Sequence, residues 1–276
     1  MSNQVVPVPS KTIMGHPAGL FVLFFTEMWE RFSYYGMRAL LTLYLTAELV
    51  NGGFGLSRQE GLELYAIFTG LVYLTPIIGG WVADNFFGQR KTIYIGGIVM
   101  AVGQILLAAS AFMSSDLDVE SRNFLFNFGL GVLIIGNGFF KPNISTLVGS
   151  LYEEGDIKRD GGFTIFYMGI NLGAMIAPLF CGYLGEVYGW HYGFGAAGLG
   201  MLAGLIVFWK GISANVLGDK GLQPIEYIDK KISGISITNI IYTIGFLLVP
   251  IFAYLIILDR EQGLNKWICL WFIVLN

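Results

Sequence analysis

Long apolar stretches are the feature that most constrains how this chain can fold. An α-helix needs about 20 mainly apolar residues to cross the hydrocarbon core of a bilayer. Seven stretches meet this need, and an eighth begins near Trp267 but is too short to span before Asn276. The seven run at 18–47, 62–82, 92–113, 123–148, 162–185, 192–209 and 238–258.

Composition supports the same fold class. Hydrophobic residues make up 55% of the 276 residues and charged residues only 13%, about half the charged share of a soluble domain. The net charge of −3 favours neither nucleic acid nor a polybasic lipid-binding switch. Cys181 and Cys269 both fall in apolar runs and are expected to be buried free thiols. We predict an all-α, polytopic membrane protein.

Lysine and arginine indicate the orientation, because cytoplasmic loops carry an excess of them. With a cytoplasmic N-terminus, the outer side would hold only Arg58, Arg122, Arg260 and Lys266. We therefore predict a multi-pass protein of the cell inner membrane with its N-terminus in the cytoplasm. The cations on the cytoplasmic side would be Lys11, Arg90, Lys91, Lys158, Arg159, Lys210, Lys220, Lys230 and Lys231.

The polar segments divide the chain into four parts. Residues 1–17 form a polar, proline-containing tail without a cleavable signal. Residues 18–210 hold six predicted spans, and 211–236 form a polar cytoplasmic linker. Residues 237–276 would be a further hydrophobic helix and the truncated start of a second.

The first three spans resemble the next three. "GGWVADNFFGQRK" separates the second and third spans, and "CGYLGEVYGWHYG" separates the fifth and sixth. In each segment a glycine precedes an acidic residue by four positions, and a further glycine follows. This pattern indicates the triplet repeat found in many secondary transporters.

The first span is unusual because four ionisable residues lie inside it. At 100° per residue, Glu27, Glu30, Tyr34, Arg38, Arg31 and Tyr35 share an arc of about 140°. Phe25, Trp29, Phe32 and Gly36 lie on the opposite side. We therefore expect an ionisable stripe that looks into a wet central crevice of the bundle.

Ionisable groups inside a membrane usually mark a transport path or a proton relay. Two carboxylates beside two guanidinium groups can exchange protonation for ion pairing, which couples proton uptake to anion binding. The alternative is a purely structural salt-bridge ladder, because Glu27 and Arg31 are four residues apart and Glu30 adjoins Arg31.

Four motifs, in order, identify a family. E-x-x-E-R-F-x-Y-Y-G lies at Glu27 to Gly36, "GGWVADNFFGQRKTI" at 79–93, "GFFKPNISTLVG" at 138–149 and "FTIFYMGINLGAM" at 163–175. Together they resemble the proton-dependent oligopeptide transporter family of the major facilitator superfamily, bacterial type. The resemblance runs from about Gly15 to Lys210. It implies the six-helix N-terminal bundle of a major facilitator fold, built as a 3+3 repeat, with one or two further membrane helices.

The resemblance also implies roles for particular residues. Proton coupling would use Glu27, Glu30, Arg31 and Lys141. The peptide would be bound by Arg31, Tyr34, Tyr35, Arg38, Tyr73, Lys141 and Asn171. Purely structural roles are the alternatives. Lys141 could extend to the membrane interface, Tyr73 could be a core tyrosine, and Asn171 could form a hydrogen bond between two helices.

Asp84, Arg90 and Lys91 lie at the cytoplasmic end of the second span, where charges are hydrated. We interpret them as a conformational latch between helices. Animal members of the family carry a coupling histidine in the second span, but Ala66 occupies that position here. The carboxylates are therefore expected to carry the proton.

The functional prediction is proton-coupled symport of di- and tripeptides by alternating access, driven by the proton gradient without a cofactor or metal. The expected partners are di- and tripeptides, protons, the lipid bilayer and a missing C-terminal half of the same transporter; nucleic acid is not expected. A carrier of another solute such as nitrate, and a peptide receptor without transport, remain alternatives. An enzyme is not expected, because H-E-x-x-H, G-x-S-x-G and G-x-x-x-x-G-K-[ST] are all missing.

Overall fold

The computed structural model describes residues 12–113, 119–224, 231–232 and 235–262. Within these described residues, seven long helical spans lie at the predicted positions. They are α1 (Ala18–Thr46), α2 (Arg58–Val82), α3 (Gly88–Phe112), α4 (Val119–Ser150), α5 (Lys158–Ala177) with its continuation, α7 (Trp190–Ser213) and α8 (Ile237–Gln262). The segment after Trp267, most of the N-terminal tail, Lys230 and Cys269 lie outside the described residues.

Short elements connect these helices. A π-helical turn, η2 (Ala83–Phe87), joins α2 to α3, and another, η3 (Pro178–Gly182), continues α5 into α6 (Tyr183–Tyr188). A 3₁₀ turn, η1 (Leu49–Asn51), follows α1. Two-residue strands form two small antiparallel pairs, β1 (Thr12–Ile13) with β2 (His16–Pro17) and β3 (Lys231–Ile232) with β4 (Ile235–Ser236).

Five described stretches are long and apolar enough to cross a membrane: 58–112, 120–150, 158–188, 190–213 and 237–256. Helix α1 differs from them in composition, because it contains Glu27, Glu30, Arg31 and Arg38. Its 29 residues give a length of about 44 Å, which exceeds the roughly 30 Å hydrocarbon core. Length therefore permits α1 to span, provided that its charges are enclosed by protein.

The helices pack as the triplet repeat predicts. If α1, α2 and α3 correspond to α4, α5 and α7, the main contacts among these six helices fall into equivalent pairs. Helix α1 packs on α5 as α4 packs on α2, and α3 packs on α4 as α7 packs on α1. Gly88 and Gly189 stand at equivalent junctions, with φ of +70° and +123° that only glycine adopts readily. The chain therefore folds as two similarly packed three-helix units.

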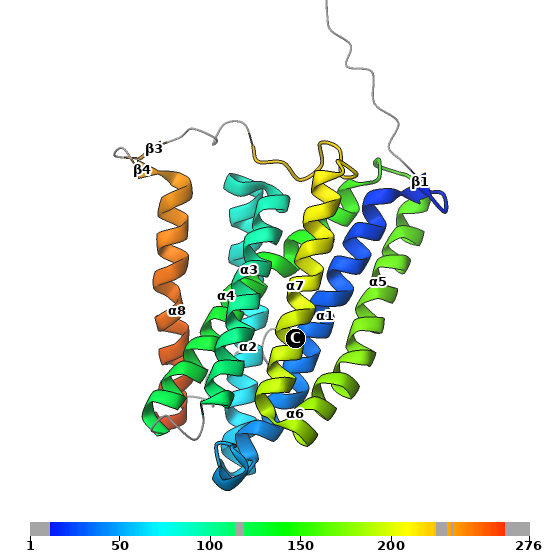
Figure 1. Ribbon diagram of the computed structural model, residues 1–276. Helices are drawn as coiled ribbons and strands as arrows, with labels where there is room; N and C mark the ends of the chain where they lie inside the picture. Colours follow the sequence, from blue (N-terminus) through cyan, green and yellow to red (C-terminus); the bar gives the residue numbers. More distant parts are fainter. Residues whose placement is uncertain (1–11, 114–118, 225–230, 233–234, 263–276) are drawn as a thin grey trace, which may run out of the picture.

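Glycines allow the closest helix contacts. A Cβ atom added to Gly79 of α2 would collide with the backbone of Gly138 in α4, and one added to Gly173 of α5 would collide with the Met28 carbonyl in α1. Helix α8 packs on α4 and α2 and stands at one edge of the bundle, with α5 at the opposite edge (Figure 1).

The segment 214–224, here called the strap, follows α7 along one end of the bundle. Arg90 fixes it at the start of α3: the backbone N–H donates to the Gly221 carbonyl at 3.0 Å, and the guanidinium Nη2 donates to the Gly218 carbonyl at 2.8 Å. Leu217 is 2% exposed and packs near Gly19 of α1. The strap thus connects the ends of α1 and α3.

Candidate functional site

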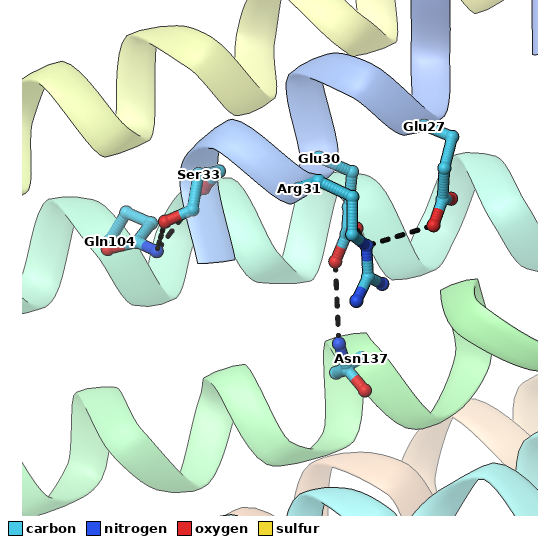
Figure 2. Close-up of polar contacts among 6 residues, drawn as sticks. All are labelled: Glu27, Glu30, Arg31, Ser33, Gln104 and Asn137. Atoms are coloured by element: carbon cyan, nitrogen blue, oxygen red, sulfur yellow. Dashed lines mark hydrogen bonds and ion pairs between the residues drawn. The ribbon is translucent and has the colours of Figure 1, made fainter. Parts of the chain in front are cut away.

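Three charged side chains of α1 form a buried cluster, here called the triad. The Nε atom of Arg31 lies 2.9 Å from Glu27 Oε1 and 2.5 Å from Glu30 Oε2. The exposed fractions of the Arg31, Glu27 and Glu30 side chains are 5%, 3% and 0%. Figure 2 shows both carboxylates directed toward the same guanidinium. Glu27 and Arg31 are four residues apart and share one helix face, whereas Glu30 reaches the same guanidinium from the adjacent position.

Two amide side chains from other helices contact this part of α1. Asn137 of α4 donates from Nδ2 to Glu30 Oε1 at 3.4 Å. Gln104 of α3 donates from Nε2 to the carbonyl and hydroxyl oxygens of Ser33 at 3.3 and 3.2 Å (Figure 2). The sequence interpretation missed both residues. A signal existed for Asn137, which lies four residues before Lys141 and therefore on the same face of α4.

The next turns of α1 carry Tyr34, Tyr35 and Arg38. The Arg31 guanidinium lies 5.6 Å from the centre of the Tyr34 ring, and Arg38 lies 6.0 Å from the centre of the Tyr35 ring. Arg38 also donates a hydrogen bond to the Tyr65 hydroxyl of α2 and lies 5.1 Å from the centre of that ring. Tyr65 is a further contact that the sequence interpretation did not name.

Lys141 and Tyr73 come together from α4 and α2. The Lys141 ammonium lies 4.3 Å from the centre of the Tyr73 ring, a cation–π contact. Among the described residues, the ion pairs to Glu27 and Glu30 come from Arg31. Asn171 is exposed on α5. Lys141 and Asn171 are therefore separate from the triad in this conformation.

The expectation that the whole ionisable stripe faces a wet crevice is wrong for the triad. Glu27, Glu30 and Arg31 are enclosed because α1 packs against α4, α5 and α7. Tyr34 is also buried, at 4% exposure, whereas the other candidates range from half-buried Tyr35, Arg38 and Lys141 to Tyr73, which is 48% exposed. The site thus has a buried charged part and a more open part that α1, α2, α4 and α5 supply.

Charge and hydrogen bonding within the triad are incomplete. Two carboxylates face one guanidinium, so one negative charge is uncompensated when both are ionised. Within the described part of the chain, Arg31 Nη2, Glu27 Oε2 and the Tyr34 hydroxyl are buried without a hydrogen-bond partner. Buried polar groups are usually satisfied, and those that are not have capacity to bind a proton, water or ligand.

The predicted latch residues do not form one cluster. Asp84 accepts a hydrogen bond from Gln89 Nε2 at 3.0 Å. Arg90 donates to the strap, and the Lys91 ammonium lies 4.9 Å from the centre of the Phe87 ring. The three residues nevertheless share the junction of α2, η2 and α3.

A 3+3 helical bundle with an ionisable cluster in its first span defines the fold class: a membrane protein with the N-terminal bundle of the major facilitator fold. The model of the POT family (PTR2) matches residues 90–216. This match confirms the resemblance to the family that the motifs indicate.

Relatives and solved structures agree with this assignment. The chain is 47% identical to a peptide transporter of Yersinia enterocolitica subsp. palearctica, over 72% of this chain and 37% of that protein. It is 42% identical to a di-/tripeptide transporter of Lactococcus lactis subsp. cremoris, over 87% of this chain and 47% of that protein. A crystal structure of a peptide transporter POT in complex with alafosfalin matches with a TM-score of 0.72 and 41% identity, covering 88% of this chain and 48% of that chain. The chain spans less than half the length of these proteins.

Proposed function

We propose that this chain forms the N-terminal part of a proton-coupled symporter of di- and tripeptides in the cell inner membrane. It would work by alternating access, with the N-terminus in the cytoplasm. Residues 18–210 would be the transporter bundle, 211–236 a cytoplasmic linker and 237–276 the start of inserted helices. The names of the similar proteins support the peptide substrate, and the triad supports the coupling ion.

The buried triad is the observation that carries the proposal. An unpaired charge in a buried site is costly, and the triad has one carboxylate more than its single guanidinium can neutralise. A proton on Glu27 or Glu30 removes the excess charge. Lys141, which lies on the same face of α4 as Asn137, is the alternative source of compensation. Proton binding and cation position are therefore linked.

The peptide would bind beside the triad. Arg31 Nη2 is buried without a hydrogen bond among the described residues, and a guanidinium binds a carboxylate in a bidentate geometry. When the peptide carboxylate pairs with Arg31 or Lys141, that cation no longer compensates the charge of the glutamates. A proton on Glu27 or Glu30 then compensates it instead. Tyr34, which is 4% exposed, would contact the peptide from the buried part of the site. The side chains that would shape the open part are Tyr35, Arg38, Tyr73, Lys141 and Asn171.

The junction of α2 and α3 would control the conformational change. Arg90 binds three carbonyl groups of the strap through its side chain and backbone. We assign Asp84, Arg90 and Lys91 to a latch that holds the cytoplasmic ends of the helices in one of the two access states. Loss of the Arg90 contacts would release the strap.

Dialanine uptake into liposomes tests the proposal, using the full-length protein that contains these residues. A proton gradient directed into the liposomes, with the more acidic solution outside, should drive dialanine to a higher concentration inside than outside. Glu30→Gln removes one proton-binding carboxylate, so it should abolish gradient-driven uptake while peptide exchange across the membrane continues. Glu63→Gln, on an exposed part of α2, is the matched control and should behave like the unmodified protein.

Each alternative predicts a different outcome. A structural ion cluster predicts that Glu30→Gln concentrates peptide as well as the unmodified protein does. A receptor predicts saturable dialanine binding without exchange, and a nitrate carrier predicts nitrate uptake without dialanine uptake. Unchanged concentrative uptake by Glu30→Gln would overturn the assignment of the proton carrier.

A further inference from the structure

Asn137 of α4 is a buried amide that contacts the triad from a different helix. It is 1% exposed, and its Nδ2 donates to Glu30 Oε1 at 3.4 Å (Figure 2). Its own oxygen, Oδ1, is buried and has no hydrogen-bond partner among the described residues. The amide nitrogen thus donates to Glu30, while the amide oxygen is an acceptor without a donor.

The two oxygens of Glu30 differ in what they can do. Oε2 lies 2.5 Å from Arg31 Nε in an ion pair, and a neighbouring cation disfavours a proton on that oxygen. A proton that reaches Glu30 is therefore best placed on Oε1, the oxygen that faces Asn137. The O–H formed there would point at the Nδ2–H group, so two donors would oppose each other.

We infer that Asn137 is a positioning residue that follows the protonation state of Glu30 by turning its side-chain amide. With Glu30 ionised, Nδ2 donates to Oε1. When a proton binds Oε1, the amide rotates by half a turn about its terminal bond, and Oδ1 accepts the new O–H. The contact between α1 and α4 is preserved in both states. This inference rests on the proposed function, in which Glu30 gains and loses a proton in each cycle.

The charged groups around Glu30 indicate that Asn137 accepts the hydrogen bond of a protonated Glu30. The charged groups that act on Glu30 are Arg31 and Glu27 on α1 and Lys141 on α4. Other packed helices carry their charged groups near their ends: Lys158, Arg159 and Asp160 begin α5, and His191 and Lys210 lie near the ends of α7. Arg31 and Lys141 can only donate hydrogen bonds, so neither can accept one from a protonated Glu30. Glu27 directs Oε1 to Arg31 Nε, and Asn137 is the neighbour that already has a hydrogen bond with Glu30 Oε1.

Three variants of the full-length protein separate this role from packing. Asn137→Leu has a similar volume and no hydrogen-bonding group. Asn137→Thr keeps a hydroxyl that can donate or accept by rotation. Asn143→Leu is the matched control, because Asn143 is also 1% exposed on α4 but donates to the Gly79 and Phe139 carbonyls, away from the triad.

The readout is the ratio of gradient-driven dialanine uptake to dialanine exchange without a gradient. Driven uptake requires Glu30 to alternate between both states, whereas exchange does not. A hydrogen bond to a charged group changes an equilibrium by roughly tenfold or more, so Asn137→Leu should lower the ratio at least about tenfold. Asn137→Thr should restore most of it, and Asn143→Leu should keep the ratio even if it lowers the amount of folded protein. An unchanged ratio in Asn137→Leu overturns the inference.

A second measurement needs no transport. Infrared difference spectra of the unmodified protein in lipid, acidic minus alkaline, should contain a shift of an asparagine carbonyl band together with the band of a protonated carboxyl group. In Asn137→Thr, the asparagine carbonyl shift should change, and so should the position of the carboxyl band. If the carboxyl band forms without any asparagine band, the inference is wrong even where transport is proton-driven. If the bands appear in a protein that does not take up dialanine, the proposed function fails and the inference holds.

Discussion

Replacing Arg31 by methionine would leave two buried carboxylates without their cation. At 2.9 and 2.5 Å, each ion pair contributes about 6 kcal/mol of attraction at an effective dielectric constant near 20. This attraction offsets the cost of removing the ions from water, which is several kcal/mol for each ion. Truncating one partner of a buried pair typically lowers stability by about 3–5 kcal/mol, and the triad should fall at the upper end because two pairs are lost.

Unfolding in detergent micelles, followed by helical circular dichroism, would measure this loss for the purified protein. Arg58→Met, which removes an exposed cation at the start of α2, is the control and should change the free energy of unfolding by less than about 0.5 kcal/mol. The combined variant Glu27→Gln, Glu30→Gln, Arg31→Met contains no charge in the cluster. It should recover most of the loss, since replacing a whole buried ion cluster by neutral groups is often neutral or stabilising.

Two results would refute this reasoning. If Arg31→Met were as stable as the unmodified protein, the cations would not be needed to hold the carboxylates inside the bundle. If the combined variant were no more stable than Arg31→Met, the loss would come from packing of the Arg31 side chain rather than from unpaired charge.

Three further predictions test the fold around the site. Gly79→Ala should lower the free energy of unfolding by about 1–3 kcal/mol, because its Cβ would meet the Gly138 backbone; Gly195→Ala, whose Cβ meets no atom within 4 Å, is the control in the same unfolding assay and should not lower it. Ser57→Ala should cost about 0.5–2 kcal/mol by removing the capping box of α2, and thermal unfolding would measure this loss. Arg90→Gln should make the strap about tenfold or more susceptible to limited proteolysis, because it loses charge-assisted bonds to two carbonyl groups; an unchanged cleavage rate would contradict this.

The sequence predicts the helices and the triad well, for local reasons. Hydropathy marks each span, because a membrane helix must be apolar over its whole length. The Glu27–Arg31 pair follows from helix geometry, since residues four apart share a face, whereas Glu30 adjoins Arg31 and reaches it through the direction of its side chain. The glycines at 88 and 189 also indicate the repeat, because both stand where the chain turns between helices.

The contacts between helices were less predictable. Asn137, Gln104 and Tyr65 reach α1 from three other helices, and their registers depend on how glycines let those helices approach. A helical wheel shows which residues share a face but not which helix covers that face. For this reason the sequence predicts an accessible stripe, whereas α4, α5 and α7 enclose the triad.

The repeat gives this enclosure a further meaning. Helices α1 and α4 occupy equivalent positions in the two three-helix units, and they carry the cations Arg31 and Lys141. Arg31 is held between two carboxylates at 5% exposure, whereas Lys141 is half-buried over the Tyr73 ring. Equivalent helices therefore place one cation in the buried part and the other in the open part of the site. Because the Glu30–Asn137 hydrogen bond joins these two helices, any movement of α1 against α4 must change the surroundings of the proton-binding carboxylate.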